Sequence, residues 1–322
     1  MIMRISKQNN LNFNHVKQAI FSRVLLGLFI IFLAGFSDTL QGCIAAEIRQ
    51  DQLKKEEIVD HFIALGDWGA GTPFQKQVAA QLATFHQAKP YASVFMLGDN
   101  IYPAGDVIKR GEQYFETMYA PLIEKKVNFI VALGNHDVIE GHGQEQIEYF
   151  KMPNNYYLKK LNTADCFIID SNTFAEDEKQ QQWLAKALHD AYLETPNRWR
   201  FVMGHHPIYS SGAHRNDSDM KQLKQKLEPL LINGHVDFYL AGHEHDYERF
   251  SAIDSVVHVV SGGGGAYLRD LKTPYLPHSL VQKKAHHFLS FQVSTDTVQY
   301  KVIDSAGGVI DEESWSKKAF SK

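Results

Sequence analysis

Residues 93–102 read Ser-Val-Phe-Met-Leu-Gly-Asp-Asn-Ile-Tyr, a short apolar run that leads into Gly98-Asp99. The same pattern of an apolar run, a glycine and a polar residue occurs five times. The five cases are Ile58–Leu65 with Gly66-Asp67, Ser93–Leu97 with Gly98-Asp99, Val127–Leu133 with Gly134-Asn135, Phe201–Met203 with Gly204-His205, and Val236–Ala241 with Gly242-His243. Apolar runs of this kind, without polar alternation, are typical of buried strands. The pattern therefore predicts at least five buried strands, each followed by a glycine.

Helical patterns lie between several of these runs. Apolar residues recur there at spacings of three and four, which bury one face of a helix. The four stripes are Phe74/Val78/Leu82/Phe85, Phe115/Met118/Leu122, Trp183/Leu184/Ala187/Leu188/Ala191 and Met220/Leu223/Leu227/Leu230. Strands that alternate with helices predict an α/β fold whose sheet is covered on its faces.

The end of the chain has a different character. Leu289, Phe291 and Val293 alternate with polar residues, as do Val298, Tyr300 and Val302. This alternation, with turn residues between and after the two runs, predicts antiparallel hairpins that close the sheet. No linker-like tract interrupts the chain, so we expect residues 47–322 to form a single domain.

The polar residues after the five glycines are Asp, Asp, Asn, His and His, all of which can bind a metal ion. Sites in open α/β sheets form at the carboxyl ends of strands, so we expect these side chains to meet. A set of oxygen and imidazole ligands without thiolate suits iron, manganese or zinc. Two such ions close together would suit phosphoryl chemistry.

Five ordered motifs carry a resemblance to a known family. They are Gly66-Asp67-Trp68-Gly69, Gly98-Asp99-Asn100-Ile101-Tyr102, Gly134-Asn135-His136-Asp137, Val202-Met203-Gly204-His205 and Gly242-His243-Glu244-His245. This order resembles the calcineurin-like metallophosphoesterases and, because a tyrosine follows the second aspartate by three residues, the purple acid phosphatases. The resemblance implies a four-layer α/β/β/α sandwich with mixed sheets. The resemblance covers nearly all of residues 47–322. The chain is similar to the small, single-domain members of the family.

The resemblance also implies a ligand set for two metal ions. Asp67, Tyr102 and His245 would hold a ferric ion, Asn135, His205 and His243 would hold a divalent iron, zinc or manganese ion, and Asp99 would bridge the two. His136 and His214 match positions that contact phosphate or help to protonate the leaving group, and His206 could face the substrate. Ala213 stands where the mammalian enzymes have an acidic residue, so the proton donor stays open.

The function implied is an acid phosphatase that hydrolyses phosphate monoesters by attack of a metal-bound hydroxide. A phosphodiesterase or nucleotide hydrolase of the same superfamily is the alternative, since those enzymes share the ligand set. A second alternative is a non-catalytic surface or phosphate-binding protein. The expected partner is a small phosphorylated substrate. No basic block indicates nucleic acid binding.

The first 46 residues are expected to be an export signal. Val24 to Phe36 is an uncharged apolar run of 13 residues behind four basic residues, which is short for a membrane span. An uncleaved N-terminal anchor and a lipid on Cys43 are the alternatives, and the protein would be secreted or periplasmic. Residues 1–46 hold four of the 33 bases and one of the 37 acids, so the remainder carries a net charge of −7. An acidic chain that handles phosphate must build its positive charge locally, and bound metal is one way to do so.

Overall fold

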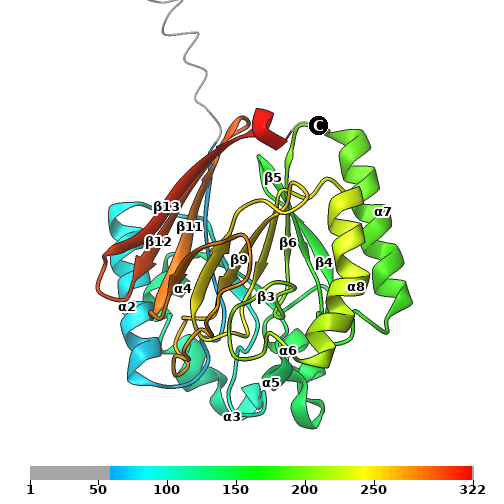
Figure 1. The fold of residues 1–322 in the computed structure, drawn as a ribbon. Coiled ribbons are helices and arrows are strands. Elements are labelled where there is room, and N and C mark those ends of the chain that lie inside the picture. Colours follow the sequence, from blue (N-terminus) through cyan, green and yellow to red (C-terminus); the bar gives the residue numbers. More distant parts are fainter. Residues whose placement is uncertain (1–58, 321–322) are drawn as a thin grey trace, which may run out of the picture. The chain divides into compact units, whose positions relative to one another are not determined.

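The computed structural model describes residues 59–320, whose strands form two mixed sheets that pack face to face (Figure 1). The six-stranded sheet has the order β13-β12-β11-β1-β2-β3, and the seven-stranded sheet has the order β10-β8-β9-β7-β6-β5-β4. The strands are β1 (Asp60–Leu65), β2 (Ser93–Leu97), β3 (Asn128–Ala132), β4 (Tyr157–Lys160), β5 (Ala164–Ile168), β6 (Trp199–Met203), β7 (Phe238–Ala241), β8 (Tyr247–Phe250), β9 (Val257–Ser261), β10 (Ser279–Lys283), β11 (His287–Val293), β12 (Thr297–Asp304) and β13 (Val309–Ser316).

Helices cover the outer face of each sheet. Figure 1 shows α7 and α8 side by side on one side of the sheets and α2 and α4 on the other. The longer helices are α2 (Pro73–Ala88), α7 (Glu178–Glu194) and α8 (Ser218–Asn233), and the short ones are α3 (Val107–Gly111), η1 (Glu112–Glu116), α4 (Ala120–Glu124), α5 (Asn135–Val138), η2 (Ile139–Gly141), α6 (Gly143–Tyr149) and η3 (Lys317–Phe320). None of the helices described between residues 59 and 320 has the length and apolarity that a membrane crossing needs.

Successive side chains of the central strands point into two different cores, which explains the four layers. In β1, Phe62 and Ala64 face the core between the two sheets, whereas Ile63 and Leu65 belong to the core under α2 and α4. A strand that buries both of its faces carries no polar alternation, which is why these runs are continuously apolar. The predicted four-layer α/β/β/α sandwich is confirmed, and so are the antiparallel C-terminal hairpins, which are β11, β12 and β13.

Two features of the fold differ from the prediction. The stripe Phe115/Met118/Leu122 predicts one helix, but the chain ends η1 at Glu116 and starts α4 at Ala120. Pro121 explains the break, because a proline lacks the N–H that continues a helix and is tolerated only in its first turn. The strands β4, β8 and β10 were not predicted, since they are short or lie at sheet edges. The expected leader, residues 1–46, lies outside the described residues.

Several histidines are buried in the sheets as neutral rings. His258 of β9 packs against Tyr209, with ring centroids 4.8 Å apart, and among the described residues its Nδ1 has no hydrogen-bond partner. Burial, with a smaller contribution from the charge of Lys224, lowers the pKa of His258 to about 3. Burial likewise lowers the pKa of His61 and of His287 to about 4. Protonating such a ring therefore favours the unfolded chain.

This burial predicts a loss of stability in acid that His258→Phe reduces. The folded-state pKa of His258 lies below its unfolded value of 6.5, so its contribution is complete above pH 6.5 and is lost as the pH falls towards the folded pKa. We expect His258→Phe to flatten the pH dependence of the unfolding free energy by about 1.4 kcal/mol per pH unit. Urea denaturation at pH 7, 6 and 5 measures it. His189→Gln, at an exposed histidine of α7, is the control, and equal slopes in all three proteins would contradict the prediction.

Candidate metal centre

Five polar side chains at strand ends meet where the two sheets come together. Asp67, Asp99 and Asn135 follow β1, β2 and β3 of one sheet, and His205 and His243 follow β6 and β7 of the other. Hydrogen bonds cross between the sheets at this point. The His205 Nδ1 atom lies 2.9 Å from the Leu97 carbonyl oxygen, and the His243 amide donates to Asp67 Oδ2 at 2.8 Å. The side chains that the sequence predicts at one edge are therefore brought together.

Tyr102 is at the centre of the first donor group. Its hydroxyl lies 3.0 Å from Asp67 Oδ1, 2.7 Å from Asp99 Oδ2 and 3.1 Å from His245 Nε2. His245 Nε2 also lies 3.2 Å from Asp67 Oδ1. Three acidic or phenolic oxygens and one imidazole nitrogen thus converge from four positions in the chain.

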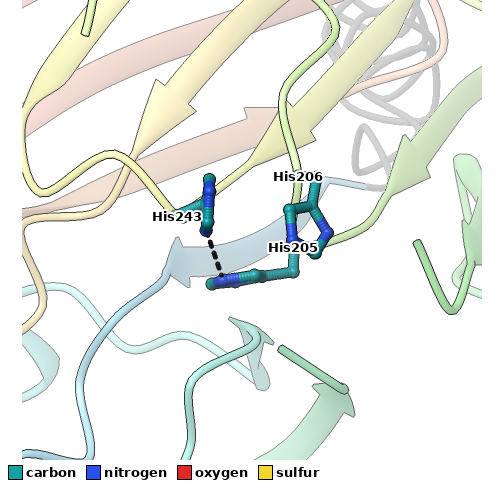
Figure 2. A group of neighbouring side chains, drawn as sticks. All are labelled: His205, His206 and His243. Atoms are coloured by element: carbon teal, nitrogen blue, oxygen red, sulfur yellow. Dashed lines mark hydrogen bonds between the residues drawn. The ribbon is translucent and has the colours of Figure 1, made fainter. Parts of the chain in front are cut away.

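Asn135 is at the centre of the second donor group. Its Oδ1 atom lies 3.1 Å from His205 Nε2 and 3.0 Å from His243 Nδ1. The two imidazole nitrogens are 3.2 Å apart, the contact drawn as a dashed line in Figure 2. His205 Nε2 also lies 3.3 Å from Asp99 Oδ1. Asp99 therefore contributes one carboxylate oxygen to each group.

The spacing of these atoms fits ligands that share a metal ion. Two ligands at right angles, each about 2.1 Å from a metal ion, lie about 3.0 Å apart. The observed separations within the two groups run from 2.7 to 3.3 Å. The two groups together suit a pair of metal ions with a bridging carboxylate.

Main-chain carbonyls fix which histidine nitrogen faces each group. A carbonyl oxygen only accepts, so His205 Nδ1 carries the proton that it donates to Leu97, and His245 Nδ1 donates in the same way to Tyr267 O at 2.8 Å. The Nε2 atoms of both rings then face the site, where each neutral ring would offer its lone pair to a metal ion. Outer hydrogen bonds of this kind orient metal-binding histidines in other proteins.

The backbone is strained at three of the converging positions. Asp67, Asp99 and His243 have φ values of 59°, 53° and 69°, a region that non-glycine residues seldom adopt. Such residues each cost about 1–3 kcal/mol and cluster at functional sites. The glycine before Asp99 is required as well, because Gly98 has φ of 85° and a Cβ there would lie 2.6 Å from His205 Nδ1. The strain points to a site that the rest of the fold holds in place.

Asp137 is a supporting residue to which the motifs gave no role. Its carboxylate is fully buried and accepts from the amides of Asn100, Ile101 and Gly134 at 2.7–3.1 Å. The side chains of Asn100 and Gln146 also donate to it. It thereby joins the loop after β2 to the start of α5, and it fixes the spacing between the two donor groups.

His136 lies beside the first donor group. Its amide donates to Asp99 Oδ1 at 3.0 Å, and its ring centroid is 4.5 Å from that of Tyr102. The ring nitrogen Nδ1 is 2.5 Å from the carbonyl oxygen of Pro103, so Nδ1 carries the proton. His136 therefore supports Asp99 through its backbone and places its imidazole next to the site, and its contact with phosphate or the leaving group stays a prediction.

His206 and His214 both lie against His243. The ring centroid of each is 4.5 Å from that of His243. Figure 2 shows His206 with His205 and His243, and one nitrogen from each of the three lies within 4.8 Å of the others. Burial lowers the pKa of His206 and of His243 well below the ordinary range. Both rings are therefore neutral, and a lone pair on each can bind a cation.

Tyr102 differs from these histidines, because its phenol would bind a metal ion in the ionised form. Burial and the carboxylates of Asp67 and Asp99 raise the pKa of its phenol well above the ordinary value of 10. A phenolate at this position therefore needs a strongly charged cation beside it, since a bound cation acts on the pKa in the opposite sense.

A cavity of about 500 Å³ opens beside the first donor group. Tyr102, His245 and Arg269 line it, together with the rings of Tyr114 and Tyr267. A small molecule in this cavity would lie next to the converging oxygens. Arg269 carries no motif, and nothing in the sequence pattern identified it.

Comparison with known proteins places the motifs in a family. The family model of the calcineurin-like phosphoesterases matches residues 87–247. Purple acid phosphatase 7 of Arabidopsis thaliana is 25% identical over 331 aligned residues, which cover 93% of this chain and 97% of the relative.

Two solved structures have a similar fold at low identity. Purple acid phosphatase PPD1 from yellow lupin (Lupinus luteus) seeds is 20% identical with a TM-score of 0.72, and the match covers 81% of this chain and 54% of that one. GAP50, the anchor in the inner membrane complex of Plasmodium, is 22% identical with a TM-score of 0.70 and coverage of 80% and 89%. These similarities support the fold, and the resemblance to purple acid phosphatases is confirmed.

The two donor groups predict that a single substitution removes one metal ion or both, depending on which group it changes. We expect two ions per chain in the purified protein. Asn135→Ala should leave one ion, because Asn135 belongs to the second group alone, and Asp99→Ala should lose both. Inductively coupled plasma mass spectrometry after gel filtration measures the content. Asn197→Ala, at an exposed residue near the opposite end of β6, is the control. Two ions retained by Asp99→Ala would contradict the assignment.

Proposed function

The chain belongs to the calcineurin-like phosphoesterase family, and we propose that it is an acid phosphatase of the purple type that hydrolyses phosphate monoesters. The observation that carries this proposal is the shared carboxylate. Asp99 directs one oxygen to the group around Tyr102 and the other to the group around Asn135. A pair of metal ions held in this way would bind the phosphate oxygens, neutralise charge in the transition state and lower the pKa of the attacking water.

We propose a distinct metal for each group. Asp67, Tyr102 and His245 supply hard anionic oxygens and one nitrogen, which favours a ferric ion. Asn135, His205 and His243 supply one neutral oxygen and two nitrogens, which favours divalent iron, zinc or manganese. Burial and the carboxylates of Asp67 and Asp99 raise the pKa of the Tyr102 phenol, so an ionised Tyr102 would require a highly charged cation beside it, which a ferric ion would be.

The surrounding histidines would act on the substrate. His136 donates from Nδ1 to the Pro103 carbonyl, so only the ring protonated at both nitrogens would donate from Nε2 to a phosphate oxygen or to the leaving group. His206 is buried and bonded to Ser171 through Nδ1 at 2.9 Å, so we assign it to shaping the phosphate-binding side of the second group. The cavity beside Tyr102 would receive the ester group.

Two other functions compete with this one. A phosphodiesterase or nucleotide hydrolase of the same superfamily would use the same donors. A non-catalytic surface or phosphate-binding protein is the other candidate, and GAP50, an anchor protein, has a similar fold. The complete donor set, with its strained backbone, favours catalysis. We also propose export, to the outside of the cell or to the periplasm, on the basis of the apolar run Val24–Phe36.

The choice between these functions rests on one comparison of substrates. We expect the purified protein to hydrolyse an aryl phosphate monoester faster than the diester with the same aryl leaving group, with its highest rate in acid. Asp99→Asn should abolish turnover, which excludes a contaminating phosphatase. Faster diester turnover, or an alkaline optimum, would assign the protein to the phosphodiesterases. No turnover of either ester with both metals bound would favour the binding protein.

The ferric assignment predicts a colour that depends on Tyr102. Charge transfer from a phenolate to a ferric ion gives visible absorption, so we expect a visible band in the wild-type protein that Tyr102→Phe removes. Tyr114→Phe, which changes another tyrosine of the same cavity, should keep the band and serves as the control. A colourless wild-type protein with two ions bound would show that the first group holds a different metal.

A further inference from the structure

Arg269 lies at the metal centre although it belongs to no motif. Its backbone amide donates to the carbonyl oxygen of His245 at 3.0 Å, which ties it to a proposed metal ligand. Its side chain is half-buried and lines the same cavity as Tyr102 and His245. A substrate held by the two donor groups would therefore lie within reach of its guanidinium group.

The guanidinium is held by His214. Arg269 Nη1 donates to His214 Nε2 at 2.8 Å and to the His243 carbonyl oxygen at 3.3 Å. An arginine in a protein stays protonated and has no acceptor. His214 Nε2 must therefore be the acceptor, so the ring proton is on Nδ1, which lies 2.8 Å from Asp217 Oδ2. In this arrangement the His214 Nε2 atom has no proton to give to a leaving group.

The loop that carries His214 is itself fixed. Glu244, between the proposed ligands His243 and His245, accepts from the amides of Ala213 and His214 at 2.8 and 2.7 Å. Glu244 is fully buried. The segment that supplies two metal ligands therefore also sets the position of His214, and through it the position of Arg269.

The charge of Arg269 interacts with the buried Asp246 carboxylate but is not paired with it at ion-pair distance. Within residues 59–320, no carboxylate forms an ion pair with it, whereas Arg198 pairs with Asp165 and Arg249 pairs with Asp311. Its Nε and Nη2 atoms also donate no hydrogen bond to any of the described residues. A half-buried guanidinium that keeps free donors beside a cavity is suited to an anion, and its planar donors match the oxygens of a phosphate.

We propose that Arg269 is a substrate-binding residue that donates from Nε and Nη2 to the phosphate group, and that His214 is a positioning residue that holds it there. The proposal rests on the proposed function, because it assumes a phosphate at the donor groups. It replaces the expectation that His214 protonates the leaving group. The ligand class is a phosphate monoester, or the inorganic phosphate that its hydrolysis releases.

Binding of inorganic phosphate to the metal-loaded protein tests the proposal directly. We expect Arg269→Ala to retain both metals and to weaken the Kd for phosphate about 10- to 100-fold, as for the loss of a charged hydrogen bond. Arg269→Lys should recover part of that loss, because the charge returns without the planar donors. Isothermal titration calorimetry gives the Kd, and the KM and kcat for a monoester give a second readout.

Two variants separate direct contact from other effects. His214→Ala should weaken phosphate binding less than Arg269→Ala, since the arginine keeps its charge but loses its support. Arg110→Ala removes a cation that bonds to Tyr114 at the edge of the cavity, and it should leave the Kd unchanged.

Some outcomes would overturn the proposal without touching the proposed function. A phosphate Kd for Arg269→Ala within twofold of the wild-type value, in a protein that still hydrolyses monoesters, would do so. If Arg269→Ala loses metal, Arg269→Lys decides, and an unchanged Kd there overturns the bidentate contact. A wild-type protein that binds phosphate through Arg269 but turns over no ester would instead contradict the function and support the inference.

Discussion

Two oxygens of one carboxylate, that of Asp99, belong to different donor groups, and much of the surrounding structure is arranged around this sharing. Asp99 has φ of 53°, follows a glycine that admits no side chain, and receives the amide of His136. The buried carboxylate of Asp137 then fixes the loop on either side of it. A shift of Asp99 would change both groups at once, which explains why strain is tolerated there.

Each of the two sheets supplies only part of the donor set. One contributes carboxylates, an amide oxygen and a phenol, and the other contributes the imidazoles, among which burial holds the pKa of His243 well below the ordinary range. Buried neutral histidines elsewhere, such as His258, weaken the fold in acid, where we propose that the enzyme works. Metal ions that bind only the folded chain would offset this loss. Metal binding at the site would therefore add to stability as well as supply chemistry.

The sequence predicted the convergence because parallel strands bring their carboxyl ends to one edge, so the residues after Gly66, Gly98 and Gly134 had to meet. The continuously apolar runs predicted a sheet covered on both faces, as β1 shows, whereas the four-layer sandwich was implied only by the family resemblance. The sequence could not predict Arg269 or Asp137, since their contacts depend on the path of loops between distant segments. The resemblance implied that His214 contacts phosphate or helps to protonate the leaving group, but it could not show that His214 Nε2 accepts a hydrogen bond from Arg269. Pro121 could have indicated the break before α4, but the apolar stripe Phe115/Met118/Leu122 suggested one continuous helix.

The central claim is that two metal ions occupy the two groups on either side of Asp99. Anomalous X-ray diffraction from crystals of the metal-loaded protein, recorded at the absorption edges of iron and zinc, tests it most directly. We expect two peaks about 3.5–4 Å apart, one among Asp67, Tyr102 and His245 and one among Asn135, His205 and His243, with Asp99 in contact with both. A single peak, or a peak held by His205, His206 and His243 without Asn135 and Asp99, would contradict it.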